Sequence, residues 1–141
     1  MTTTPSVTAL LVAAMASLTV ACASSTRIYV KSTERTNDGN TLYMAVRSVD
    51  AKPTGTGERY QEAAAKLFAD PPDPSILNNQ PIFPGNTVTV AVDDVDKDLI
   101  LYFFYTNPGP NWRVPLHRPL PAEVYIDLGQ HQIERVQIRR R

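Results

Sequence analysis

Three alternating aspartates make up the segment of the sequence whose spacing most resembles a metal site: Asp94, Asp96 and Asp98. They match the Asp-x-Asp-x-Asp opening of a calcium-binding loop, in which carboxylate oxygens hold the cation. That loop also needs glycine at its sixth position and glutamate at its twelfth, where this sequence has Leu99 and Tyr105. Lys97 adds a cation among the carboxylates. We therefore interpret the segment as a charged hairpin turn between two strands and predict no metal site.

The remaining catalytic residue types do not form a constellation. His117 lies among prolines and His131 at a turn, and neither has a neighbour at metal-ligand spacing, so both are predicted to be solvated. The sequence has no Gly-x-Ser-x-Gly elbow, no phosphate-binding glycine loop and no His-Glu-x-x-His pair. We predict a protein that is not an enzyme and that carries no cofactor.

The single cysteine, Cys22, directly follows an apolar segment. Residues 7–21 have the length of a signal-peptide core and are shorter than the roughly 20 residues that a membrane-spanning helix needs. The sequence Thr19–Val20–Ala21–Cys22 resembles the lipobox of bacterial lipoproteins. In those proteins a peptidase cuts before a cysteine whose sulfur already carries a diacylglyceryl group.

This resemblance implies a lipoprotein signal peptide over residues 1–21 and a covalent lipid, with palmitate-type acyl chains, on Cys22. Two or three such chains anchor a protein durably to a membrane. Ala23 follows the cysteine in place of an inner-membrane retention signal, which favours the periplasmic leaflet of the outer membrane. Two alternatives stay open: an uncleaved membrane anchor, and an ordinary signal peptide cut near Ala21 or Ala23.

The composition fits one domain with an apolar core and gives no sign of nucleic-acid binding. The 141 residues include 14 basic and 14 acidic side chains, so the formal net charge is zero. Because counterion release needs a clustered basic face, we predict no nucleic-acid partner. The only basic run, residues 139–141, is interpreted as a solvated tail.

The elements that must position these residues are mostly strands. Alternating or continuous apolar patterns predict strands over residues 27–31, 41–49, 87–93, 99–105, 123–128 and 132–138. Residues 99–105 are apolar at every position, which is typical of a central strand covered on both faces. The apolar alternation slips between Ile133 and Val136, which predicts a β-bulge.

One segment has the period of a helix. Over residues 58–69, apolar side chains recur at helical spacing, with Tyr60 and Phe68 predicted to pack in the core and Glu62 predicted to pair with Lys66. The pattern as a whole predicts an all-β protein with a helical insertion: a two-sheet antiparallel β-sandwich over residues 27–138, after a short tether at 22–26.

The order of these features resembles a known family, the outer-membrane lipoproteins of the type VI secretion system called TssJ. The matching parts are the lipoprotein cysteine, an Asn-containing loop at Asn37–Asp38–Gly39–Asn40, and the strand from Leu42 to Val49 with a helical insertion after it. Ile82–Phe83–Pro84–Gly85 and Trp112–Arg113 are the most specific pieces. The bulky strand before Trp112 departs from the family pattern and indicates a divergent member.

The resemblance implies a transthyretin-like sandwich that anchors a trans-envelope complex by binding the periplasmic C-terminal domain of the inner-membrane protein TssM. In the family, the loop between the first two strands takes part in that contact. Here this loop is predicted to lie at the end of the domain far from the membrane. The predicted partner-binding residues are Thr33, Glu34, Arg35, Thr36, Asn37, Asp38, Gly39 and Asn40, with Glu34, Arg35, Asn37 and Asp38 as the polar contacts.

The alternative hypothesis is a binding protein of a different class. A periplasmic sandwich lipoprotein that captures a carbohydrate or inhibits an enzyme would use aromatic rings as stacking surfaces. The candidates for that role are Trp112, Tyr102 and Tyr105.

Overall fold

A computed structural model describes residues 24–50 and 58–141. The predicted signal peptide, Cys22 and Ala23 lie outside these residues. The described strands are β1 (Ser25–Lys31), β2 (Leu42–Val49), β3 (Ile76–Ile82), β4 (Thr87–Asp93), β5 (Asp98–Phe104), β6 (Arg113–Leu116), β7 (Glu123–Leu128) and β8 (Ile133–Arg139). The same described residues also form a short 3₁₀ turn, η1 (Thr36–Gly39), and an α-helix, α1 (Tyr60–Leu67).

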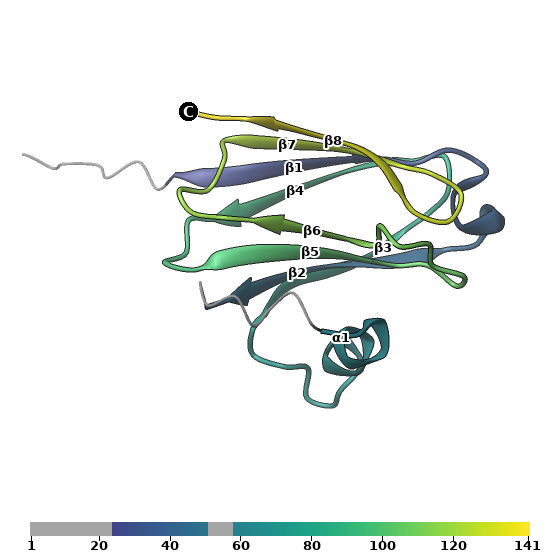
Figure 1. Ribbon diagram of the computed structural model, residues 1–141, viewed down its shortest axis with the longest axis horizontal. Coiled ribbons are helices and arrows are strands. Elements are labelled where there is room, and N and C mark those ends of the chain that lie inside the picture. The colour runs from purple at the N-terminus through teal and green to yellow at the C-terminus, as the bar shows by residue number, and fades with distance from the viewer. Residues whose placement is uncertain (1–23, 51–57) are drawn as a thin grey trace, which may run out of the picture.

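The strands form two four-stranded sheets packed face to face (Figure 1). Their orders are β4-β1-β7-β8 and β3-β2-β5-β6. The predicted two-sheet sandwich with one helical insertion is confirmed, with one departure from antiparallel pairing: β1 and β7 run parallel. The charged turn at residues 94–97 therefore does not close a hairpin, because β4 and β5 belong to different sheets.

The main core lies between the sheets and follows the predicted alternation. Leu42, Met44 and Val46 of β2 point into it, as do the odd-numbered apolar residues of β5. The other face of β5 packs under α1, where Ile100, Tyr102 and Phe104 meet Ala63 and Leu67 of the helix. Strand β5 is buried along its whole length, as its continuous apolar sequence predicts.

The predicted bulge in β8 is also confirmed. Asp127 pairs with Arg135 while Leu128 pairs with Ile133, so one extra residue is accommodated at Glu134. Strands β3 and β6 were not predicted. Each contains a proline, Pro81 and Pro115, and both lie at the edges of their sheet, where a missing N–H is tolerated.

The helix is shorter than the predicted range 58–69, and its charged pairing differs. Arg59 is extended and caps the helix with Glu62, whose carboxylate accepts a 3.1 Å hydrogen bond from the Arg59 N–H. Lys66 pairs with Glu58 in place of Glu62. The predicted core position of Phe68 is wrong: its ring is 61% exposed and meets the exposed Tyr43 edge-on.

Candidate functional site: the distal face

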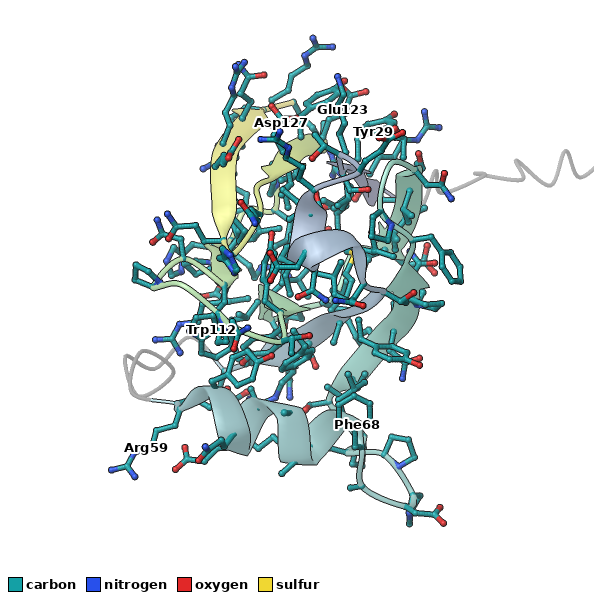
Figure 2. All side chains as sticks on the ribbon, turned by 90° about the vertical axis from the view of Figure 1, so that its right-hand side faces the viewer. Tyr29, Arg59, Phe68, Trp112, Glu123 and Asp127 are labelled. Atoms are coloured by element: carbon teal, nitrogen blue, oxygen red, sulfur yellow. The ribbon has the colours of Figure 1, made fainter. Side chains whose placement is uncertain are left out.

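Four connections meet at the end of the sandwich opposite Ser25. They join β1 to β2, β3 to β4, β5 to β6, and β7 to β8, because each first strand of these pairs runs toward that end (Figure 1). We call this surface the distal face and define it as residues 33–40, 83–86, 106–111 and 129–132. Figure 2 looks onto it, with the η1 turn near the centre.

The β1–β2 connection has an unusual backbone that its sequence explains. Asn37 and Asp38 have φ angles of 52° and 54°, and Gly39 has a φ of 81°. Asparagine, aspartate and glycine are the residues that adopt this left-handed region most readily. Three consecutive residues of this kind turn the chain tightly enough for β2 to begin three residues later, on the other sheet.

Asn37 holds the connection to its neighbours. Its side chain is 1% exposed, and its Nδ2 donates to the carbonyls of Asn40 and Thr41, each at 3.2 Å. Its Oδ1 accepts a 2.8 Å bond from the N–H of Thr106, and its own N–H donates to the carbonyl of Gln130 at 2.9 Å. Asn37 therefore ties three of the four connections together, two through its side-chain amide and the third through its backbone N–H.

The fourth connection is tied through Ser32. Its hydroxyl donates to the carbonyl of Asn86 at 2.8 Å and lies 3.3 Å from that of Phe83. Gly85 turns this connection with a φ of 89°, and the Glu34 side chain lies beside it. The distal face is thus a braced platform in place of four independent loops.

The exposed rim of the platform carries polar groups that already contact one another. Gln130 Nε2 donates to Asp38 Oδ1 at 2.6 Å, and His131 Nε2 lies 3.5 Å from the same oxygen. His131 Nδ1 also lies 3.2 Å from the carbonyl of Asn107. His131 was predicted only as a solvated side chain; the structure shows that it bridges three connections.

The eight predicted partner-binding residues divide into two groups. Six are exposed on the distal face: Thr33, Glu34, Arg35, Asp38, Gly39 and Asn40. Thr36 and Asn37 are buried, and their polar groups bond within the protein. Asn37 was predicted to be a polar contact for the partner, but its side chain forms hydrogen bonds within the protein.

The alternating aspartates do not converge on a common point. Arg118 forms ion pairs with Asp94 and Asp96 at 3.7 and 3.3 Å. Asp98 is largely buried and accepts bonds from His117 Nδ1 at 3.0 Å and from the Arg118 N–H at 2.9 Å, which lower its pKa. Within the described residues, no three potential metal-ligating side chains lie together.

The aromatic rings proposed for carbohydrate stacking are unsuited to that role. Tyr102 and Tyr105 are each 1% exposed, and Trp112 packs against Tyr60 and stacks on Tyr102. A sugar could not reach either tyrosine face without unpacking the sandwich. The prediction of these tyrosines as stacking surfaces is therefore wrong.

The helix is attached to the sheet by a largely buried carboxylate that sequence reasoning missed. Glu58 accepts bonds from Arg47 at 2.8 Å and Lys66 at 2.5 Å, and from the hydroxyl of Tyr102. Burial opposes ionisation of Glu58, but these donors outweigh it and lower the pKa of the carboxyl. Burial and the neighbouring carboxylate together raise the pKa of Tyr102 to about 12. The cluster fixes α1 over β5.

Comparison with known protein families shows to which family this chain belongs. A family model described as the N-terminal domain of IglE matches residues 43–128, from β2 to the end of β7. The chain belongs to the IglE family. No curated protein sequence matches it. Among the described residues of this IglE-family protein, every helix is too short or too polar to cross a bilayer.

Solved structures share the fold of this family member at low sequence identity. The type VI secretion lipoprotein TssJ1 from Pseudomonas aeruginosa matches with a TM-score of 0.59 at 14% identity, covering 83% of this chain and 97% of that one. Lip from Serratia marcescens, described as a membrane-bound component of that system, matches with a TM-score of 0.59 at 16% identity, covering 82% and 97%. A chain in a structure of the TssM C-terminal domain from EAEC matches with a TM-score of 0.63 at 15% identity, covering 78% and 95%. The predicted resemblance to TssJ is thereby confirmed.

Proposed function

We propose that this protein is a non-catalytic lipoprotein adaptor of a type VI secretion-like envelope complex. In this proposal a lipid on Cys22 holds it at the outer membrane, and the distal face binds the periplasmic domain of a TssM-like inner-membrane protein. The observation that carries the proposal is the braced platform at the end of an IglE-family sandwich opposite the predicted anchor.

The position of the anchor supports this orientation. Strand β1 begins at Ser25, two residues earlier than the sequence predicted, so only Ala23 and Ser24 separate it from Cys22. The three steps from Cys22 to Ser25 reach about 11 Å at most, which would hold the Ser25 end of the sandwich close to the bilayer. The seven residues of β1 then carry the chain about 23 Å away from it. The distal face would point into the periplasm, toward a partner rising from the inner membrane.

The rigidity of the platform also supports a binding role. Binding to loops that are already ordered costs less conformational entropy than binding that must first order them. The exposed Glu34, Arg35 and Asp38 offer both signs of charge on that platform, which suits a polar, specific contact with a protein.

Co-purification tests the proposal. The detergent-solubilised full chain should retain the periplasmic domain of the TssM-like protein from the same cells, and should not retain an unrelated periplasmic domain of similar charge. Failure to retain the TssM-like domain, with the sandwich shown to be folded by circular dichroism, would contradict the adaptor role.

A further inference from the structure

The inner face of β8 is only partly covered, although it continues the core-facing surface of β7. Ile133, Val136 and Ile138 face inward, because their partners across the ladder, Leu128, Ile126 and Val124, are core residues. Those three partners are 0–2% exposed. Val136 and Ile138 are 38% and 44% exposed, so no element among residues 24–50 and 58–141 covers the apolar side of β8 over much of its length.

The cause is the shortness of the opposing strand. Strand β6 has only four residues, and it is the last strand of its sheet on the side of β8. Between the two edges lies a groove of about 310 Å³, lined by four apolar residues, Val114, Pro115, Ile133 and Val136, and by four polar ones, Asn111, Arg113, Glu134 and Arg135. At the other side of the sandwich a hollow of about 270 Å³ also lies between β3 and β4, but there the inward-facing Val90 and Val92 of β4 are only 4% and 6% exposed.

The free edge of β8 is suited to backbone pairing. In the described part of the chain β8 pairs with β7 alone, and Figure 2 shows it, in yellow, at the margin of the molecule. An edge strand presents unpaired N–H and C=O groups that can accept a further strand. Proline interrupts both edges of the other sheet, at Pro81 and Pro115, whereas residues 133–139 contain none.

The charge of the β8 edge indicates which kind of strand would pair with it. Residues 133–141 include four arginines and one glutamate. Arg135 and Arg139 face outward and pair with Asp127 and Glu123 at 3.5 and 3.1 Å, yet their side chains remain 65% and 71% exposed. Acidic residues on an added strand would approach these arginines from the open side.

We propose that the edge of β8 binds an extended segment of a partner protein in which acidic and apolar residues alternate. The apolar residues of that segment would cover Val136 and Ile138, and the acidic ones would face Arg135 and Arg139. A second copy of this chain is a poorer occupant, because antiparallel pairing centred on Gln137 sets Arg135 opposite Arg139 of the other copy and no register supplies the alternating acidic residues. The contact does not use the distal face, so it stands apart from the adaptor proposal.

A synthetic peptide is the probe for this edge. The full chain in detergent is titrated with a capped eight-residue peptide of alternating Glu and Val, and with two controls. One control alternates Lys and Val; the other keeps Glu and Val but carries N-methyl groups on alternate backbone nitrogens, which removes pairing without changing charge. Binding is measured by calorimetry, and hydrogen exchange reports protection of residues 133–139.

We expect saturable binding of the unmodified Glu/Val peptide but of neither control peptide, together with slowed hydrogen exchange across β8. Arg135→Gln with Arg139→Gln should weaken that binding roughly fivefold, as loss of two cross-strand charge pairs implies. Arg27→Gln with Lys31→Gln, which removes two outward-facing charges from central strand β1, should leave it unchanged. Equal binding of the N-methylated peptide, or no saturation up to a concentration of about 1 mM, would overturn the proposal.

Discussion

The N–H of Thr106 donates a 2.8 Å hydrogen bond to Oδ1 of Asn37, across 69 residues of sequence. It joins the end of β5, in one sheet, to the connection that leaves β1 in the other. The buried Asn37 side chain therefore links two connections of the distal face, and the backbone N–H of the same residue adds a bond to the β7–β8 turn.

Replacing Asn37 by alanine should therefore destabilise the protein strongly. The change removes the side-chain bonds to Asn40, Thr41 and Thr106, and it places a Cβ-bearing residue without a polar side chain at a φ of 52°. We expect a loss of about 2–4 kcal/mol in the free energy of unfolding, measured with urea. Asn37→Gly removes the same hydrogen bonds but relieves the backbone strain. Its loss in the free energy of unfolding should therefore be about 1 kcal/mol smaller than that of Asn37→Ala. Equal stability of the wild-type and alanine proteins would show that these bonds do not brace the loop.

Removing the charge of Glu58 should loosen the helix. Glu58→Gln leaves Arg47 and Lys66 without their carboxylate partner under α1. Because breaking a buried ion pair from one side leaves the other charge uncompensated, we expect a loss of about 2–3 kcal/mol in the free energy of unfolding. Hydrogen exchange should accelerate in residues 60–67 more than in the sheets. Asp70→Asn, which removes an exposed carboxylate just beyond the helix, is the control and should leave exchange unchanged. Unchanged exchange in the Glu58 variant would contradict the attachment role.

Acid should weaken the fold through the same carboxylate. The folded-state pKa of Glu58 is lowered from its ordinary value of 4.5 because of its donors, and that of Asp98 is lowered from 3.8. Stabilisation from a carboxyl with a lowered pKa is complete above its unfolded value and is lost as the pH falls through the folded value. The melting temperature should be flat with respect to these groups above about pH 5.5 and fall below about pH 4.5. The fall in melting temperature should be shallower in Glu58→Gln. An acid profile identical to that of the wild type would show that Glu58 does not contribute to the fall.

Much of the fold could be predicted from the sequence, because burial sets the side-chain period. The apolar alternation predicted strands over residues 41–49 and 87–93, and the continuous apolar run predicted that β5 is buried on both faces; the structure has all three. Strands β3 and β6 escaped prediction because edge strands carry proline and polar residues that read as loop. The bracing role of Asn37 and the pairing of Glu58 with Arg47 depend on contacts between distant segments. No local pattern reports such contacts.

Fractionation tests the lipid anchor predicted at Cys22. Cys22→Ser should move the protein from the membrane fraction to the soluble periplasmic fraction, because a thiol at that position is required for acylation. Labelling with radioactive palmitate should be lost in the same variant. Persistence of the variant in the membrane pellet after a high-salt wash would indicate that an uncleaved apolar segment holds the protein in place of a lipid.

The affinity of the distal face for the TssM-like periplasmic domain tests the adaptor role most directly. Exchanging two exposed charges, Glu34→Arg with Arg35→Glu, keeps the net charge and leaves Asn37 intact. The matched control exchanges Asp96→Lys with Lys97→Asp in the turn at the opposite end of the sandwich. Calorimetry should show the first variant binding at least about tenfold more weakly than wild type, since misplaced interface charges commonly cost more than 1.4 kcal/mol. The control should bind as wild type does. Wild-type affinity in the Glu34/Arg35 variant, or an equal loss in both variants, would contradict a partner site on the distal face.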